Sequence, residues 1–375
     1  MLASLVSILS PSPERAVPPC PHAAACGGCT LQHLADSAYA AWKRGLAAAA
    51  LARAGFADPP LAPLSRSPAG SRRRAELALV RAGGRVVVGF HGRRSHTVVD
   101  APHCRVLHPS LLATAEALRG ALSRLACLRR EGVAILTLTG TGIDLWLVTD
   151  GVPDADGRAA LAAFAAESRL ARLSWSRPGE AAEPVATLAV PAMRFAGVAV
   201  PLPPGAFLQA TAEGEAAIVS AVLAALEDLP DAAMVADLYA GCGTLTFPLS
   251  RRFRVRAVEG DSAALAALEA GIRAAGLSGR VVAEARDLAL HPLAAAEQRR
   301  LSAVVLDPPR EGARAQVAAL AAGPASRIVY VSCSVQSLER DAKVLREAGF
   351  RLDRAVPIDQ FLWSAHLECV ASFSR

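Results

Sequence analysis

The sequence predicts an α/β protein with an N-terminal α+β domain and a C-terminal Rossmann-like domain, and three observations support this fold class. From residue 205 onward, short apolar strands alternate regularly with helical segments, as in a parallel sheet. Before it, apolar runs come in pairs around glycine turns, which indicates antiparallel hairpins. The proline-rich segment Pro201–Gly205 separates the two patterns. We therefore expect a tail over residues 1–19, a first domain over 20–204 and a second over 205–375.

The composition indicates a globular protein with an anionic partner. Apolar residues make up 53% of the 375 residues, and no apolar run reaches the length of a membrane span. The start, Met1–Leu9, lacks the basic residues and cleavage site of a secretion signal, so we expect a cytoplasmic protein, and we expect a monomer. The net charge of +6 and the grouped arginines of the first half fit nucleic acid as the partner.

Eight cysteines in a chain without a secretion signal argue against a disulfide framework. Three of them, Cys20, Cys26 and Cys29, have the close spacing of metal ligands. Iron–sulfur clusters are usually held by four cysteines, of which one is often distant, so we expect a [4Fe–4S] cluster with Cys104 as the fourth ligand. Zinc is the alternative, although structural zinc sites usually contain two short cysteine pairs. The other candidate ligands are His22, His33, His103 and Cys127.

The first half predicts helices and antiparallel strands. A proline-rich loop, Pro59–Pro68, follows the first helix, and Ala82-Gly83-Gly84 gives a hairpin signal between the first two strands. The triplet Arg72-Arg73-Arg74 leads into this hairpin, either as a solvated edge or as a contact to phosphate. The expected helices are 37–54 and 157–169, and the expected strands are 76–81, 85–90, 133–139 and 144–149.

The second half predicts a parallel sheet that follows a helix over residues 211–227. The expected strands are 234–239, 255–259, 280–284, 303–306 and 328–333, with two more near 351–356 and 366–372. In such sheets, ligands bind in the crevice at the carboxyl ends of the strands. The loops at those ends are therefore expected to carry the functional residues.

A glycine turn, Ala240-Gly241-Cys242-Gly243, follows the first of these strands, and Glu259 ends the second. The glycines let the backbone approach a ligand, and the glutamate can accept hydrogen bonds from two ribose hydroxyls. A dinucleotide-binding motif needs another glycine where Thr246 stands, so S-adenosylmethionine is the better candidate. A tight turn that binds nothing is the alternative.

The fourth strand runs into Asp307-Pro308-Pro309-Arg310, which is expected beside the glycine turn. The two prolines fix the turn, and the aspartate can meet both the cofactor and a base. Amino-group methyltransferases often carry an aromatic residue after the two prolines. Arg310 stands there in this chain, which argues for a different chemistry.

Cys333 ends the fifth strand and is a candidate nucleophile, with a buried inert thiol as the alternative. A thiolate that adds to C6 of uracil makes C5 nucleophilic enough to take a methyl group, and a base then removes the C5 proton. We expect the site to favour the thiolate. Glu368, which has apolar neighbours in a terminal strand, is the candidate base, although many such carboxylates are simply solvated.

Taken together, these residues resemble the class I RNA 5-methyluridine methyltransferases. The matching motifs, in the order and spacing of that family, are Phe207-Leu-Gln209, Asp237-Leu-Tyr239-Ala-Gly-Cys-Gly243, Val258-Glu259, Asp307-Pro-Pro-Arg310, Tyr330-Val-Ser-Cys333 and His366-Leu-Glu368. The segment from Cys20 to Cys104 is similar to the members that bear an iron–sulfur cluster. The resemblance extends from Cys20 to the end of the chain.

The resemblance implies methylation of uridine C5 in RNA by S-adenosylmethionine, with 23S rRNA as the first candidate target. It implies Cys333 as the nucleophile and Glu368 as the base. The residues implied around S-adenosylmethionine are Gln209, Tyr239, Glu259 and Asp307, with Asp287 as a further adenine contact. The alternatives are the same reaction on transfer RNA, a catalytically lapsed iron–sulfur RNA-binding protein, and methylation of cytosine C5.

The chain departs from this family in two places. Ser334-Val335 replaces the Asn-Pro pair that commonly follows the catalytic cysteine. Cluster-bearing relatives often begin with a small RNA-binding β-barrel, and only 19 residues precede Cys20 here, so we expect this barrel to be lacking. The first departure concerns the geometry of the pocket, and the second concerns the choice of RNA.

Overall fold

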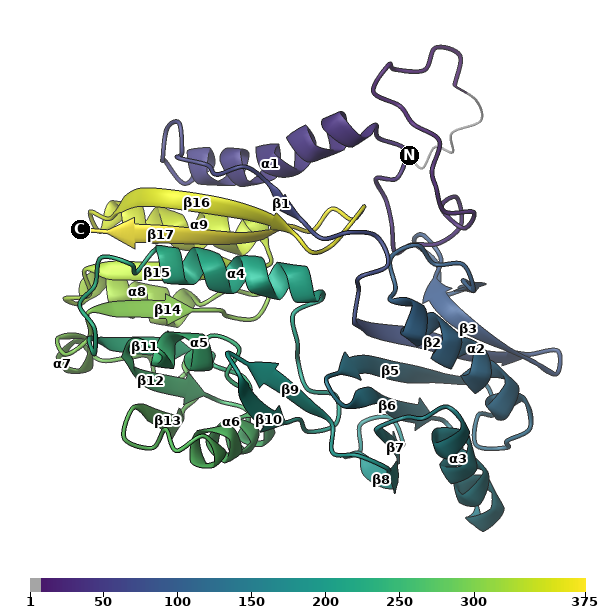
Figure 1. The fold of residues 1–375 in the computed structure, drawn as a ribbon. Coiled ribbons are helices and arrows are strands. Elements are labelled where there is room, and N and C mark those ends of the chain that lie inside the picture. The colour runs from purple at the N-terminus through teal and green to yellow at the C-terminus, as the bar shows by residue number, and fades with distance from the viewer. Residues whose placement is uncertain (1–7) are drawn as a thin grey trace.

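Two β-sheets, one built mainly from each half of the chain, organise the structure (Figure 1). It is a computed structural model that describes residues 8–375, so Met1–Ser7 of the expected tail lie outside the described residues. Over residues 8–375, no helix combines the length and the apolar character that crossing a membrane requires.

The larger sheet has eight strands in the order β1-β16-β17-β15-β14-β11-β12-β13. Strands β11 to β15 run parallel to their neighbours within that set, whereas β17 is antiparallel to both β15 and β16. This is the parallel core that the strand–helix alternation predicts. The bounds are β1 (Ser65–Arg66), β11 (Met234–Leu238), β12 (Arg254–Glu259), β13 (Val281–Ala285), β14 (Ala303–Leu306), β15 (Arg327–Ser332), β16 (Arg351–Asp359) and β17 (Glu368–Ser374).

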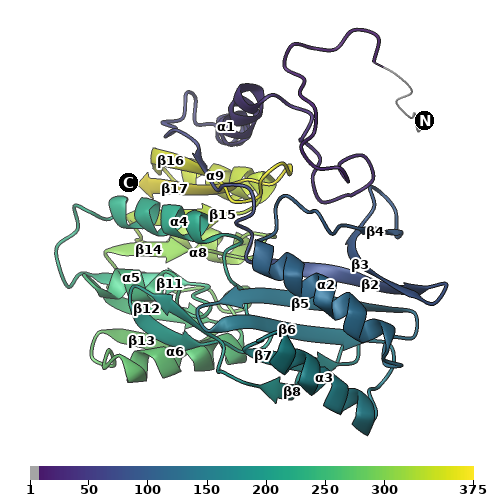
Figure 2. The same cartoon turned by 45° about the vertical axis from the view of Figure 1, so that its right-hand side comes forward.

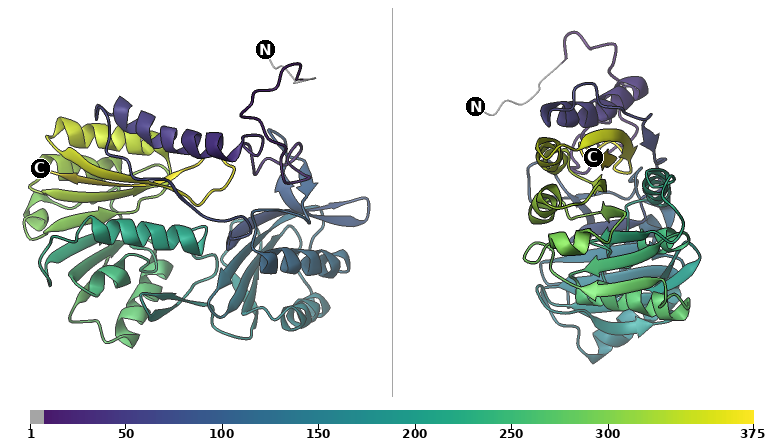
Figure 3. Two further views of the ribbon diagram at one scale, coloured as in Figure 1. Left: turned by 45° about the horizontal axis from the view of Figure 1, so that its top comes forward. Right: turned by 90° about the vertical axis from the view of Figure 1, so that its left-hand side faces the viewer.

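Helices cover both faces of this sheet (Figure 3). One face packs against α4, α5 and α6, with Ile218 and Leu268 in its core. The other packs against α1, α8 and α9, with Leu51 and Leu338 in its core. The helices of this half are α1 (Asp36–Arg53), α4 (Ala212–Ala224), α5 (Thr246–Ser250), α6 (Ser262–Ala274), α7 (Ala295–Gln298), α8 (Arg314–Ala322) and α9 (Val335–Glu347).

The smaller sheet has seven strands in the order β4-β3-β2-β5-β6-β7-β8 and is antiparallel except between β6 and β7. Two helices, α2 (Pro109–Ser123) and α3 (Ala155–Glu167), cover one of its faces (Figure 2). The strands are β2 (Arg74–Ala82), β3 (Arg85–His91), β4 (Val98–Asp100), β5 (Glu131–Thr139), β6 (Gly142–Thr149), β7 (Arg172–Ser176) and β8 (Glu183–Thr187). The sequence did not predict α2, β4, β7, β8 or the separate hairpin of β9 (Ala192–Phe195) and β10 (Val198–Pro201).

The expected division at residues 204 and 205 does not separate the two sheets. Helix α1 and strand β1 come from the expected first domain, yet α1 packs on α9 and β1 pairs with β16 of the larger sheet. The β9–β10 hairpin also packs there, through Phe195 and Val200. An amphipathic helix or a short strand carries no local signal for the sheet it will cover, so composition alone does not place such segments.

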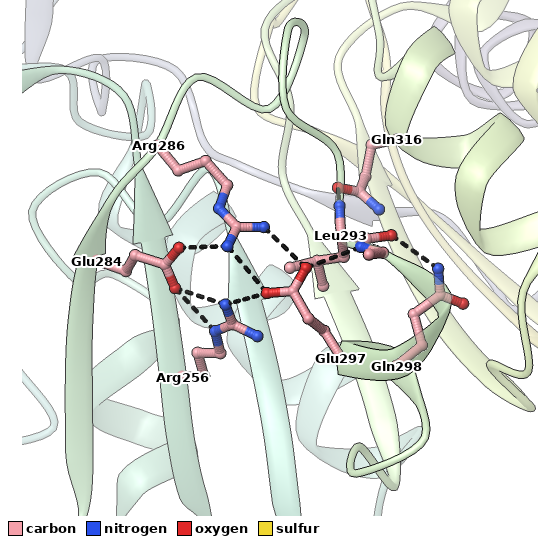
Figure 4. A network of polar contacts seen from close by, with 8 residues as sticks. Arg256, Glu284, Arg286, Leu293, Glu297, Gln298 and Gln316 are labelled. Atoms are coloured by element: carbon pink, nitrogen blue, oxygen red, sulfur yellow. Dashed lines mark hydrogen bonds and ion pairs between the residues drawn. The ribbon is translucent and has the colours of Figure 1, made fainter.

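An ion-pair network ties α7 to β12 and to the edge strand β13 (Figure 4). Arg256 of β12 pairs with Glu284 of β13 at 2.7 Å, and Arg286 pairs with Glu297 of α7 at 2.9 Å. The Arg286 guanidinium, with help from Arg256, lowers the pKa of Glu297 to about 2, so this carboxylate stays ionised at neutral pH. The network therefore fixes the short helix that precedes β14.

Lys43 of α1 is fully buried and ties this helix to the loop before β17. Its Nζ donates to Asp359 Oδ1 at 2.7 Å and to the carbonyl oxygens of Phe361 and His366. The Tyr39 hydroxyl donates to the other Asp359 oxygen at 2.6 Å. Burial lowers the pKa of Lys43, and the Asp359 carboxylate opposes that shift. The N-terminal helix is thus anchored to the segment that leads into Glu368.

Replacing Lys43 by alanine is expected to lower the free energy of unfolding by about 3–5 kcal/mol, because the buried Asp359 carboxylate then lacks its charged partner. Urea denaturation followed by circular dichroism measures the change. Lys343→Ala is the matched control, since Lys343 is exposed and pairs with Glu347 only at 4.0 Å; its effect should stay below about 0.5 kcal/mol. A Lys43→Ala protein as stable as this control would contradict the anchoring role.

Candidate active site

The catalytic and most of the cofactor-binding residues predicted from the sequence lie at the carboxyl ends of the parallel strands. Strand β11 leads to Tyr239, β12 ends at Glu259, and β14 leads to Asp307. Cys333 follows β15, and Glu368 begins the antiparallel β17 at the same end of the sheet. The fold therefore brings together residues that are far apart in the sequence.

Cys333 and Glu368 face each other across the β15–β17 pair. Ser332 pairs with Cys369, so the antiparallel register places Cys333 opposite Glu368. Glu368 is only 2% exposed, whereas Cys333 is partly exposed. Burial, and after it the Asp307 carboxylate, raises the pKa of Glu368 well above its usual range. A partly accessible thiol thus lies opposite a buried carboxyl group with a high proton affinity.

The protein's own groups disfavour the Cys333 thiolate, contrary to the expectation from the sequence. Burial, followed by the carboxylates of Glu368 and Asp307, raises the pKa of this thiol to about 12. The Arg310 guanidinium opposes the rise but does not outweigh it. The expectation from the sequence did not include the burial of Cys333 or the two carboxyl groups that the fold places beside it.

Ser334 preserves the local geometry where the chain departs from the family motif. It is the N-cap residue of α9, and its Oγ accepts a hydrogen bond from the backbone N–H of Ser337 at 3.3 Å. Serine and asparagine are equally good N-caps, and the next position, Val335, is the first helical residue, where proline is favoured but not required. The replacement of Asn-Pro by Ser-Val therefore keeps a capped helix directly after Cys333.

A chain of hydrogen bonds links the two buried carboxyl groups through two glutamines. Gln209 donates through Nε2 to Asp307 Oδ2 at 2.9 Å. Gln360, in the loop after β16, donates through Nε2 to Gln209 Oε1 and to Glu368 Oε2, both at 2.7 Å. Sequence reasoning missed Gln360, and no local pattern marks it, because its partners Gln209 and Glu368 come from two other segments of the chain.

The glycine turn after β11 is held by Glu259. The Glu259 carboxylate accepts hydrogen bonds from the backbone N–H groups of Gly241 and Asp261, at 2.7 Å each. Each of its oxygens keeps a free lone pair, which fits the ribose contact predicted for this residue. Gly243 has a φ of +99°, and a Cβ there would lie 2.4 Å from the Phe247 ring, so the turn requires glycine at this position.

Tyr239 and Asp287 lie beside Glu259. Tyr239 has a φ of +62°, a left-handed conformation that turns the chain sharply after β11. Burial raises the pKa of its hydroxyl to about 12, and the Asp341, Asp287 and Glu259 carboxylates add to the rise. Asp287 accepts a hydrogen bond from the Ala289 N–H at 2.8 Å. The residues implied around the cofactor are therefore neighbours.

Only part of the arginine triplet is available to a ligand. Arg73 is 6% exposed, pairs with Glu215 at 2.5 Å and donates to the backbone oxygen of Gln209 at 3.0 Å, so it holds the site together instead of contacting phosphate. Arg74 lies over the exposed ring of Phe207, 5.9 Å from its centroid. Exposed arginines of the first half that can meet phosphates include Arg85, Arg93, Arg94, Arg105, Arg124, Arg129 and Arg130.

The four predicted cluster ligands are neighbours at the edge of the smaller sheet. Cys26 forms an isolated bridge with Gly92 after β3, and Cys104 follows β4. Burial raises the pKa of Cys29 to about 11, and the thiols of Cys104, Cys26 and Cys20 contribute to the rise. The distant Cys104 is therefore close enough to the other three to act on them electrostatically.

The four cysteines at this edge of the smaller sheet offer four thiol groups as possible ligands. Over residues 8–375, no three cysteine, histidine, aspartate or glutamate side chains stand close enough to hold one metal ion. Iron–sulfur clusters are usually held by four cysteine thiolates, and this is the number and kind of donor found here. Cys127 is buried in the core of the smaller sheet, and the His22 and His103 rings stack on each other at 6.2 Å.

Comparisons with known proteins agree with this arrangement. A model of the tRNA (uracil-5-)-methyltransferase family matches residues 200–375. An uncharacterized RNA methyltransferase of Brucella suis is 40% identical over 373 residues, which cover 100% of this chain and 88% of the relative. The 23S rRNA (uracil(1939)-C(5))-methyltransferase RlmD of Chromohalobacter salexigens is 35% identical over 385 residues, which cover 100% of this chain and 79% of the relative.

A solved structure shares the fold. The Pyrococcus abyssi tRNA (uracil-54, C5)-methyltransferase in complex with S-adenosyl-L-homocysteine matches with a TM-score of 0.73 and 21% identity. The match covers 98% of this chain and 88% of that chain. The predicted α/β methyltransferase fold is therefore confirmed.

Proposed function

The chain belongs to the RNA uracil-C5 methyltransferase family and transfers a methyl group from S-adenosylmethionine to C5 of uracil in RNA, and we propose that it acts on 23S rRNA through a covalent Cys333–C6 bond. The observation that carries the covalent route is the register that places Cys333 opposite the buried Glu368. A nucleophile and a base at one end of one strand pair are what methylation of an unreactive ring carbon needs.

In this proposal, the Cys333 thiolate forms a bond from Sγ to C6 of the target uracil. The electrons of the C5–C6 double bond are displaced into an enolate, which makes C5 nucleophilic. When bound, S-adenosylmethionine would supply the methyl group to C5 with S-adenosylhomocysteine as the leaving group, and its positive sulfonium charge would favour the thiolate. Glu368 then takes the proton from C5, the C5–C6 double bond re-forms, and Cys333 leaves as thiolate. Gln209, Tyr239, Glu259 and Asp307 form the binding site of the methyl donor.

The target uridine must leave its stack or loop to reach Cys333, at a cost of a few kcal/mol. The proposed choice of 23S rRNA rests on RlmD, which matches along the whole of this chain. Incubating the protein with labelled S-adenosylmethionine and either unmodified 23S rRNA or unmodified transfer RNA tests this choice. We expect label in 23S rRNA, and label in transfer RNA alone would overturn the proposed target.

A catalytically lapsed protein is the weaker candidate. The Ser334-Val335 departure was the sequence feature in its favour, and Ser334 caps α9 as asparagine would. Cys333 and Glu368 are both present, and they lie opposite each other at the end of the β15–β17 pair. The observations therefore favour an active enzyme.

We also propose that Cys20, Cys26, Cys29 and Cys104 hold a [4Fe–4S] cluster. The proximity of four thiols from two separate segments supports this, because iron–sulfur clusters are usually held by four cysteines. When bound, the cluster would join the N-terminal loop to the smaller sheet. No electron is needed for the methyl transfer, so a structural role is proposed.

Anaerobically purified protein is expected to contain about four iron atoms and four sulfides per chain and to absorb near ~400 nm. Cys29→Ser should lose most of the iron because one thiolate ligand is missing. Cys127→Ala is the matched control, and it should keep the iron because Cys127 is buried in the core of the smaller sheet. Zinc in place of iron, or equal iron in both variants, would contradict the cluster assignment.

We propose a cytoplasmic location, which suits an enzyme whose substrates are RNA and S-adenosylmethionine. The monomeric state stays a prediction. Size-exclusion chromatography with light scattering measures it directly.

A further inference from the structure

Gln360 lies between the candidate base and the cofactor side of the site, and we propose that it is a positioning residue for proton abstraction: it holds Oε2 of Glu368 and leaves Oε1 to accept the C5 proton. The inference rests on the proposed role of Glu368 as the base. Gln360 is 2% exposed, in the loop between β16 and β17. Its role follows from the direction of three hydrogen bonds.

The orientation of the Gln360 amide is determined by its neighbours. The backbone N–H of Ala210 can only donate, and it lies 2.9 Å from Gln360 Oε1, so this oxygen accepts. The Nε2 group then has two hydrogens, and both are used, toward Gln209 Oε1 and Glu368 Oε2 at 2.7 Å each. If the amide were flipped, Nε2 would face the Ala210 N–H, and Oε1 would face two other acceptors, Gln209 Oε1 and Glu368 Oε2. Gln360 must therefore donate to Glu368.

This contact makes the two oxygens of Glu368 unequal. Oε2 accepts the hydrogen bond from Gln360, whereas Oε1 is buried and has no hydrogen-bond partner among the described residues. Leaving a buried carboxylate oxygen without a hydrogen bond is unfavourable, so an unpaired Oε1 in a site that faces Cys333 indicates an acceptor kept open for a substrate proton. The geometry thus assigns proton acceptance to Oε1.

The hydrogen bond from Gln360 also affects the pKa of Glu368, and so the fraction of this base that is ionised. The groups that face Glu368 are Asp307 after β14, Cys333 after β15 and Cys369 beside it in β17, with Arg310 nearer to Cys333. Burial and Asp307 favour the protonated form of Glu368, and the Gln360 hydrogen bond opposes them by stabilising the carboxylate. Without this donor the pKa of Glu368 rises further, and less of the base is ionised at neutral pH.

Gln360 is packed tightly enough to hold this position. A Cβ on Gly214 of α4 would lie 2.6 Å from the Gln360 Cβ, so glycine at that position lets the glutamine side chain pass under the helix. The far end of Gln360 also orients Gln209, whose own Nε2 then points at Asp307. One side chain therefore aligns the base and a residue of the methyl-donor site.

The test is Gln360→Met, which keeps the size of the side chain and removes its hydrogen bonds. We expect turnover at neutral pH to fall about 10- to 100-fold. The methylated Cys333–RNA adduct should accumulate, because its formation precedes proton abstraction, and its decay should recover as the pH is raised. Gln316→Met is the matched control: Gln316 of α8 is a buried glutamine whose Oε1 accepts from the Leu293 N–H at 3.0 Å (Figure 4). It should keep wild-type turnover without an adduct.

Wild-type turnover by Gln360→Met would overturn the proposal. So would a slower enzyme with no adduct and an unchanged pH profile, since a merely structural defect slows every step alike. Should Gln360→Met fail to fold, Gln360→Asn must show a partial adduct, and its absence in a folded protein would equally overturn the proposal. Failure of the base assignment is distinguishable, because Glu368→Gln would then also give no adduct.

Discussion

Replacing Cys333 by alanine is expected to lower methylation of RNA by more than about 10⁴-fold, because the covalent route to a nucleophilic C5 is lost. The loss should appear in the chemical step, so binding of S-adenosylmethionine should change little. The structure supports this separation, since the glycine turn follows β11 and Glu259 ends β12, whereas Cys333 lies after β15. Transfer of labelled methyl groups to RNA and calorimetric titration with S-adenosylmethionine measure the two quantities.

Cys127→Ala is the matched control for this experiment. Cys127 is a thiol buried in the core of the smaller sheet, and its removal should leave the rate of methylation unchanged under conditions in which the protein is folded. A Cys333→Ala protein that still methylates uridine at an appreciable rate would rule out the covalent route.

Replacing Glu368 by glutamine is expected to trap a methylated covalent adduct between Cys333 and RNA. An amide cannot take the C5 proton, so the ring cannot expel the thiolate after methyl transfer. Multiple turnover should fall by about 10²–10⁴-fold. The adduct should migrate as a slow band on a denaturing gel and should carry both labelled RNA and a labelled methyl group.

The double variant Cys333→Ala/Glu368→Gln should give no slow band, which shows that the bond is to Cys333. A Glu368→Gln protein that turns over normally, or that stalls without any adduct, would mean that another group removes the proton. The buried position of Glu368 and its hydrogen bond from Gln360 predict the trapped species.

The catalytic half of the fold was predictable because its signals are local. Each parallel strand is a short apolar run bounded by a turn, so β11, β12, β14 and β15 could be located closely from the sequence. The rule that ligands bind at the carboxyl ends of such strands then placed Glu259, Asp307 and Cys333 together. The resemblance to a family supplied the roles, which the strand pattern alone does not contain.

What the sequence could not reveal depends on contacts between distant segments. Helix α1 has an apolar face, but only the fold shows that this face covers the larger sheet, where Leu51 enters the core and Lys43 pairs with Asp359. The high pKa of Cys333 arises first from burial and then from the carboxyl groups of Glu368 and Asp307, which come from distant parts of the sequence. Gln360 has no motif around it, and its function is visible only in the directions of its hydrogen bonds.

Mass spectrometry of nucleosides from RNA treated with this protein and deuterium-labelled S-adenosylmethionine tests the central claim most directly. The account predicts labelled 5-methyluridine formed by the wild type and lost in Cys333→Ala. Labelled 5-methylcytidine, label at another position of uridine, or equal 5-methyluridine from Cys333→Ala would contradict it.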